Sequence, residues 1–173
     1  GYPEGKRASE SLCQAYIQKY GIDVVIPRIS RTFGPTMLLS DSKASSQFIM
    51  NAVHKENIVL KSAGTQLYSY AYVADIVSAL LFLLVKGQKG EAYNVSNEHC
   101  DITLRTFAET LANVAGTKVI HGEATAQEKQ GFSKATKALL DNQKIYALGW
   151  RPLYDSMEEP LKHTIKILEG SGN

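Results

Sequence analysis

The sequence predicts an α/β fold, and two observations carry that prediction. Segments whose apolar residues recur at helical spacing alternate along the chain with short runs of β-branched and other apolar residues. The composition, with 44% hydrophobic and 21% charged residues over 173 positions, is that of a globular protein of one domain's length. Strands that alternate with helices are typical of a parallel sheet covered by helices.

The first part of the chain predicts a helix, a strand and a turn. Apolar side chains in residues 4–20 fall on one helical stripe, and Gly21 is suited to end that helix. The β-branched run 22–26 predicts a buried strand. Gly34-Pro35 predicts a turn. Because the chain starts without Met and inside a helical pattern, we expect it to be a fragment of a longer protein.

The middle of the chain predicts two helices and two short extended segments. Strands are expected at 58–60 and 67–72. A helix is expected over 73–85, and because it is apolar around most of its surface we expect it to be deeply packed. A further helix is expected over 42–54, with four apolar side chains turned inward: Phe48, Ile49, Ala52 and Val53.

The later part of the chain continues the alternation. Strands are expected at 91–95 and 118–120, with a helix between them that Thr103 caps and that runs to residue 114. Another helix is expected over 136–148.

The C-terminal end predicts one more helix and a loose tail. Ser156 and Glu159 have the spacing of a capping box, which places the start of the last helix there. Residues 170–173 are expected to be a disordered tail.

Charge and cysteine usage exclude several classes of protein. The net charge of +2 gives no reason to expect nucleic acid or an anionic membrane as a partner. The longest apolar stretch, residues 76–85, is too short to span a bilayer. Cys13 and Cys100 belong to no Cys/His cluster, so we expect neither a metal site nor a disulfide framework, and a cytoplasmic location.

The nucleotide-binding signature of parallel α/β proteins is absent from the sequence. Such proteins hold a pyrophosphate at a glycine-rich turn after the first strand. No GxxGxxG or GxGxxG pattern occurs in the chain. We therefore expect that the chain does not bind NAD by itself.

The first residues carry a pattern that suits acid/base chemistry. Tyr2 and Lys6 are four residues apart, so they share one face of a helix. A lysine ammonium beside a phenol favours the phenolate and makes the tyrosine usable as a general acid/base near neutral pH. The spacing alone is common by chance, and its context decides the interpretation.

Four segments follow this pair in order along the chain. They read RISRTFGPTM at 28–37, GTQLYSYAYVAD at 64–75, EAYNV at 91–95 and LGWRP at 148–152. With the Tyr-x-x-x-Lys pattern, they resemble the extended short-chain dehydrogenase/reductase family, and within it the NAD-dependent nucleotide-sugar epimerases and dehydratases. The first segment is most similar to UDP-glucuronate decarboxylases and dTDP-glucose 4,6-dehydratases.

The resemblance implies a fold and a division into domains. The chain would be the C-terminal part of a Rossmann-like doubly wound sheet together with a small α/β substrate-binding domain. Residues 1–35 would end the Rossmann-like domain, and residues 36–169 would form mainly the substrate-binding domain, with 64–95 returning partly to the first. The glycine-rich NAD loop would lie upstream.

The resemblance also implies roles for particular residues. The family acts through a keto-sugar intermediate, with NAD as cofactor, a nucleotide sugar as substrate, and a homodimer as the expected assembly. Tyr2 would be the catalytic acid/base and Lys6 its partner. Tyr2, Lys6 and Arg28 would contact NAD, and the substrate would be bound by Arg31, Thr32, Gln66 and Tyr68.

The sequence departs from the family pattern at the substrate site. Tyr68 stands where relatives carry an arginine for the substrate diphosphate, and Arg31 stands where many carry asparagine. A phenol cannot replace a guanidinium, so either Arg31 supplies the missing charge, with Lys61 as a weaker candidate, or Arg31 is a surface residue. Asp75, at the start of an apolar helix, is expected to interact with the helix dipole rather than to act in catalysis.

Three interpretations of function therefore stand side by side. The chain is the substrate-binding portion of an NAD-dependent epimerase, dehydratase or decarboxylase of nucleotide sugars, inactive by itself. Alternatively, it is a binding fragment without turnover. The third possibility is a part of a short-chain reductase whose free carbonyl substrate needs no diphosphate clamp.

Overall fold

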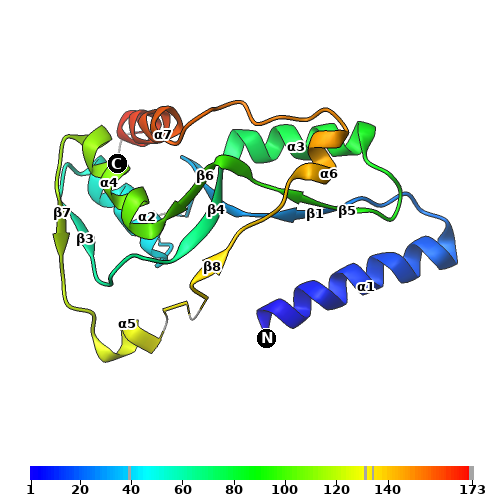
Figure 1. The fold of residues 1–173 in the computed structure, drawn as a ribbon, viewed down its shortest axis with the longest axis horizontal. Coiled ribbons are helices and arrows are strands. Elements are labelled where there is room, and N and C mark those ends of the chain that lie inside the picture. Colours follow the sequence, from blue (N-terminus) through cyan, green and yellow to red (C-terminus); the bar gives the residue numbers. More distant parts are fainter. Residues whose placement is uncertain (39, 131, 134, 172–173) are drawn as a thin grey trace.

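The computed structural model describes residues 1–38, 40–130, 132–133 and 135–171 and confirms the predicted α/β class (Figure 1). Helices and strands alternate along most of the chain. In chain order the elements are α1 (Tyr2–Tyr20), β1 (Ile26–Ile29), β2 (Arg31–Phe33), α2 (Ala44–Val53), β3 (Ile58–Leu60), β4 (Leu67–Tyr72), α3 (Val73–Lys86), β5 (Ala92–Val95), β6 (Asn97–Thr103), α4 (Leu104–Ala115), β7 (Val119–His121), α5 (Ala126–Gln130), β8 (Lys137–Ala138), α6 (Gln143–Ala147) and α7 (Glu158–Gly170).

The described strands form three small sheets. β1 pairs with β5 and β3 pairs with β7, both in parallel. The largest sheet has the order β2-β4-β6, in which β4 runs parallel to β2 and antiparallel to β6. β8 also pairs with β4, in parallel. β4 is therefore the strand on which the central part of the fold is built.

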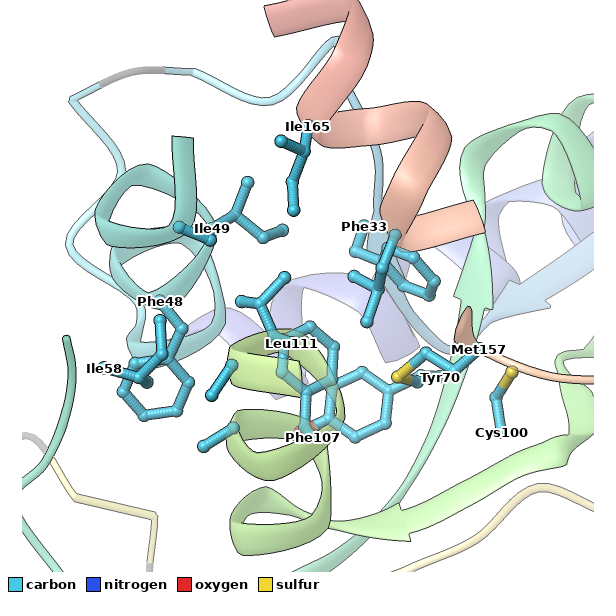
Figure 2. Packing of buried hydrophobic residues seen from close by; sticks show 14 of the residues in the cluster. Phe33, Phe48, Ile49, Ile58, Tyr70, Cys100, Phe107, Leu111, Met157 and Ile165 are labelled. Atoms are coloured by element: carbon cyan, nitrogen blue, oxygen red, sulfur yellow. The ribbon is translucent and has the colours of Figure 1, made fainter. Parts of the chain in front are cut away.

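The larger core lies between the central sheet and helices α2, α4 and α7 (Figure 2). Phe107 of α4 is fully buried, with its ring centroid 5.8 Å from that of Phe33 and 5.1 Å from that of Tyr70. Leu111 from the same helix and Leu161 of α7 are also fully buried. Aromatic side chains from β2, β4 and α4 thus join the sheet to its helices.

A second cluster surrounds the β1–β5 pair and includes Tyr93, Val95 and Trp150. Asp75, in the first turn of α3, is fully buried beside it and accepts hydrogen bonds from the Leu153 backbone N–H (2.7 Å) and the Asn97 side chain (3.4 Å). Burial raises the pKa of the Asp75 carboxyl. Asp75 therefore joins α3 to the chain before α7, in addition to the role expected at the helix start.

Helix α1 lies apart from α2, α4 and α7 and runs beside the β1–β5 pair (Figure 1). It buries none of its residues. As predicted, Gly21 ends it in the left-handed conformation, with φ of 69°. The apolar stripe that Leu12, Tyr16 and Tyr20 form on this helix is exposed.

Helix α3 corrects the expectation of deep packing. Ile76, Ala79 and Leu83 are buried, but Leu81, Leu84 and Val85 expose 61–80% of their surface. The physical reason is that α3 meets strands on one side, namely β1, β2 and β4. Within the described part of the chain, no helix is long and apolar enough to cross a membrane.

Three other local predictions were wrong. The strand expected at 22–26 starts at Ile26, where pairing with β5 begins. The helix expected over 136–148 is replaced by β8 and the short α6, because Lys137 and Ala138 pair with β4. The predicted capping box does not form, since α7 begins after Met157 without a side-chain cap.

The structure tests the prediction of a disordered tail at residues 170–173 only in part. Helix α7 continues through Gly170, so that residue is ordered within the helix. Residues 172–173 lie outside the described residues, and the prediction for them stays a prediction.

Candidate substrate cavity and acid/base helix

The main candidate site is a cavity of about 570 Å³ beside α2, β3 and β4. Its lining includes three of the four predicted substrate residues, Arg31, Gln66 and Tyr68, although Arg31 and Tyr68 are 37 positions apart in the sequence. Residues just before α2, one residue of α5 and residues 132–133 complete the wall, and no motif indicated them: Ser42, Lys43, Glu128, Phe132 and Ser133. The cavity thus combines basic side chains and one carboxylate with aromatic and amide groups.

Arg31 opens strand β2 and lies over an aromatic ring of the neighbouring strand. Its guanidinium carbon is 3.8 Å from the centroid of the Tyr68 ring, a cation–π contact that holds the guanidinium plane in place. Tyr68 is itself fixed, because its hydroxyl donates to the Ala135 carbonyl at 3.2 Å. Among the described residues, no carboxylate pairs with Arg31. Its positive charge is therefore held at the cavity without an internal counterion.

The surroundings of Arg31 favour an anionic ligand. Tyr70, directly opposite Arg31 in the β2–β4 register, is buried, and burial raises the pKa of its phenol to about 12. Tyr70 therefore stays neutral at physiological pH and cannot neutralise Arg31. A guanidinium presents several N–H donors in a planar fork that matches phosphate oxygens.

Gln66 adds an unpaired acceptor to the same cavity. Its backbone carbonyl accepts from the Leu104 N–H at 3.0 Å, which fixes the residue at the junction of β4 and α4. Its side-chain Oε1 is buried and, among the described residues, has no hydrogen-bond partner. A buried unpaired acceptor costs free energy, so a ligand that donates a hydrogen bond here would be stabilised.

Lys61, the weaker of the two predicted cations, is already paired. Its Nζ lies 2.6 Å from Oε1 of Glu128, a residue of α5. The other Glu128 oxygen accepts from the Thr125 N–H at 2.8 Å. The ion pair with Lys61, followed by the Thr125 hydrogen bond, lowers the pKa of Glu128 to about 2. Of the two candidates, Arg31 is therefore the cation that is not already paired with a described carboxylate.

The Lys61–Glu128 pair predicts a titration that can be followed on the α5 wall. A carboxyl with a lowered folded-state pKa contributes to stability above its ordinary value of 4.5 and loses that contribution as pH falls through about 2. The Thr125 amide proton shift should therefore titrate well below pH 4.5. The Lys61→Met variant should move this midpoint upward, and a midpoint near 4.5 in the unaltered chain would contradict the pairing.

Thr32 is separated from the other predicted substrate residues. It lines a smaller cavity of about 220 Å³ together with Gly34, Asp41 and other residues of the β2–α2 connection. Its hydroxyl donates to the Ser30 carbonyl at 3.3 Å. Because successive side chains of a strand point to opposite faces, Arg31 and Thr32 cannot serve the same surface of β2. The substrate role of Thr32 stays a prediction.

Tyr2 and Lys6 lie together on the first turns of α1. The Lys6 Nζ is 5.4 Å from the centroid of the Tyr2 ring, as the four-residue spacing requires. Tyr2 exposes 78% of its surface, and neither residue lines either of the two cavities. The structure therefore places the predicted pair on the exposed surface of α1, away from both cavities.

Arg28, predicted to contact the cofactor, is bound to α1. Its Nε and Nη2 donate to the two carboxylate oxygens of Glu10 at 2.8 and 2.6 Å. This pair lowers the pKa of Glu10. A cofactor contact for Arg28 stays a prediction. Within the described residues no group of three or more His, Cys, Asp or Glu could hold a metal ion.

Comparisons with known proteins show the family of the chain. The family model for the NAD dependent epimerase/dehydratase family matches residues 1–96. The chain is 32% identical to UDP-glucuronic acid decarboxylase 1 of Xenopus tropicalis over 99% of its length and 40% of the relative's. It is 28% identical to the dTDP-D-glucose 4,6-dehydratase of Mus musculus over 95% and 46% of the two lengths.

A solved structure shows the same fold. UDP-glucose 4-epimerase of Thermotoga maritima, solved with UDP-glucose, superposes with a TM-score of 0.82 at 22% identity. The superposition covers 96% of this chain and 52% of the epimerase. The chain thus spans about half the length of the proteins it matches, or somewhat less.

Proposed function

Because the chain belongs to the NAD-dependent epimerase/dehydratase family, we propose that it is the substrate-binding, C-terminal portion of an enzyme acting on a nucleotide sugar. The reaction proceeds through a 4-keto sugar intermediate. The observation that carries this proposal is the Arg31–Tyr68 stack in a cavity that also holds the unpaired Gln66 acceptor. A nucleotide sugar offers what these groups lack, namely a diphosphate for the guanidinium and N–H or hydroxyl donors for the amide.

The charge argument explains how the chain dispenses with an arginine at position 68. A diphosphate removed from water without a cation carries a desolvation cost that neutral donors rarely offset. Arg31 supplies the cation, and the Tyr68 ring supplies the surface that orients its guanidinium. Replacement of arginine by tyrosine at position 68 therefore moves the diphosphate contact across to strand β2.

The acid/base chemistry is assigned to Tyr2 and Lys6 on the first turns of α1. Tyr2 takes a proton from a sugar hydroxyl, and Lys6, whose ammonium lies 5.4 Å from the centroid of the Tyr2 ring, is its partner. NAD, when bound, supplies the hydride chemistry, and the protein supplies orientation and proton transfer. Tyr2 and Lys6 would also contact the cofactor. The chain alone, without a glycine-rich turn, does not bind NAD and has no turnover.

Two features of the fold support the proposed division into domains. In the described part of the chain, β1 pairs with β5 alone, and α1 buries none of its residues. Isolated two-stranded parallel sheets are rare, because parallel strands normally lie in larger sheets covered on both faces. Residues 1–35 and part of 64–95 therefore belong to a larger Rossmann-like sheet, and residues 36–169 form mainly the substrate-binding domain. The exposed stripe on α1 supports the proposed homodimer contact.

A short-chain reductase for a free carbonyl substrate is the second candidate. The observation that favours it is the buried phenol of Tyr68. This tyrosine stands where relatives carry an arginine for the substrate diphosphate, and its hydroxyl donates to the protein's own backbone. In that case Arg31, which is exposed in the structure, would face solvent and bind no phosphate. The two functions differ in whether a nucleoside diphosphate binds the cavity.

Calorimetry on the 173-residue chain tests the proposal. We expect UDP to bind saturably. The Arg31→Ala variant should raise the dissociation constant for UDP at least about tenfold, which corresponds to roughly 1.4 kcal/mol of binding free energy. The matched control is Arg7→Ala, which removes an exposed arginine of α1. NAD should give no saturable heat. Equal UDP affinity in the Arg31→Ala chain, or no binding of any nucleoside diphosphate, would favour the free-carbonyl reductase.

A further inference from the structure

One row of side chains on α1 combines the acid/base pair with the attachment of the helix. Tyr2, Lys6, Glu10 and Gln14 follow each other at four-residue intervals, so neighbours in this row are adjacent on the helix surface, and the row winds around the axis by about 40° at each step. The first two carry the proposed chemistry. The last two hold the helix to the rest of the chain, since Glu10 binds Arg28 and the Gln14 amide donates to the Gly90 carbonyl at 2.7 Å.

The attachment is polar and local. Because α1 buries none of its residues, the apolar packing that normally fixes a helix is small here. A third contact, from the Lys89 ammonium to the Gly21 carbonyl at 2.5 Å, holds the C-terminal end of the helix. Glu10 is thus the described tether closest to Tyr2, from which it is separated by eight residues, or about 12 Å of helix.

The Glu10–Arg28 contact has the geometry that restricts motion. Both carboxylate oxygens are engaged by two nitrogens of one planar guanidinium, at 2.8 and 2.6 Å. A bidentate pair fixes direction as well as distance, whereas a single hydrogen bond allows rotation about its axis. Arg28 is anchored in strand β1, where it is paired in register with Asn94 of β5. Arg28 therefore connects strand β1 directly to the row of side chains on α1.

We propose that Arg28 is a positioning residue, which grips Glu10 and so fixes the rotation of the helix row that presents Tyr2 and Lys6. The catalytic consequence rests on the proposed function, but the ordering of α1 does not. Direct binding of NAD by Arg28 is the competing assignment, and in the structure its carboxylate-facing fork is already filled by Glu10.

Hydrogen exchange on the 173-residue chain tests the ordering. Exposed ion pairs contribute little to global stability, so the expected effect is local: Arg28→Met should speed amide exchange in residues 2–14 about fivefold. Exchange in β4 and α4 should not change. The matched control is Lys55→Met, which breaks the exposed Lys55–Glu169 pair (2.8 Å) away from α1. The charge-exchanged double variant, Glu10→Arg with Arg28→Glu, should restore most of the protection.

Kinetics of the full-length enzyme provides the second readout. Arg28→Met should lower kcat about tenfold, because misplacing a catalytic group has this scale of effect, while the KM for the nucleotide sugar stays within twofold. The double variant should recover most of kcat. Unchanged exchange in α1 of Arg28→Met would overturn the proposal, whatever the activity. Restored exchange without recovery of kcat would also overturn it, in favour of direct cofactor binding.

Discussion

Replacing Tyr2 by phenylalanine in the full-length enzyme is expected to lower turnover by about 10²-fold or more, the usual contribution of a general acid/base. The substitution removes one oxygen and leaves the ring beside Lys6, so the binding of cofactor and substrate should persist. Steady-state kinetics with the nucleotide sugar, together with a fluorescence titration of NAD, measures both quantities.

Tyr16→Phe is the matched control for this prediction. Tyr16 lies on the same helix and is also exposed, but it is outside the row that carries Tyr2 and Lys6. Its substitution should leave turnover within twofold of the original. If Tyr2→Phe retained near-original turnover on the true substrate, the acid/base assignment would have to be abandoned.

Replacing Phe107 by alanine is expected to destabilise the fold by about 3–5 kcal/mol, the range for deleting a fully buried phenylalanine ring. The Phe107 ring is fully buried and contacts the rings of Phe33 and Tyr70, so its loss leaves a void between α4 and strands β2 and β4. Urea denaturation followed by circular dichroism gives the free energy of unfolding.

Phe132→Ala serves as the control for the core substitution. Phe132 exposes 39% of its surface at the edge of the cavity, so less apolar contact is lost when it is truncated. We expect a loss below about 1.5 kcal/mol there. Equal losses at the two positions would mean that the core is not organised around Phe107 in solution.

Much of the fold could be predicted because its signals are local. Strands β3 and β4 begin and end at the predicted residues. Helix α4 starts after Thr103, whose hydroxyl accepts from the Thr106 N–H at 3.0 Å, and ends at Gly116 in the left-handed conformation. Caps, turns and apolar stripes are properties of neighbouring residues, so one sequence suffices to find them.

The elements that were missed depend on partners far along the chain. Strand β6 is largely polar and has no strand-like pattern, yet it pairs with residues 67–70 of β4, with a register shift between Ser69 and Tyr70. Strand β8 exists because two residues add to the other side of β4. Such elements are selected by tertiary pairing, which overrides the local preference of the residues involved.

The candidate site divides in the same way. The Tyr2–Lys6 pair follows from spacing within one helix. Arg31 could be singled out because Tyr68 lacks the charge that relatives carry at that position, and Arg31 is a charged residue where many relatives have asparagine. The Glu128 partner of Lys61 lies 67 residues further along the chain, and no sequence signal connects the two. The same holds for the bond between Glu10 and Arg28, which becomes visible once α1 is placed beside β1.

The central claim is that the cavity at Arg31, Gln66 and Tyr68 binds a nucleotide sugar through its diphosphate. A crystal structure of the 173-residue chain with UDP-glucuronate tests it most directly. We expect the diphosphate within hydrogen-bonding distance of the Arg31 guanidinium, and a ligand donor directed at the Gln66 side-chain oxygen. A diphosphate bound away from Arg31, with the guanidinium turned to solvent, would contradict the account.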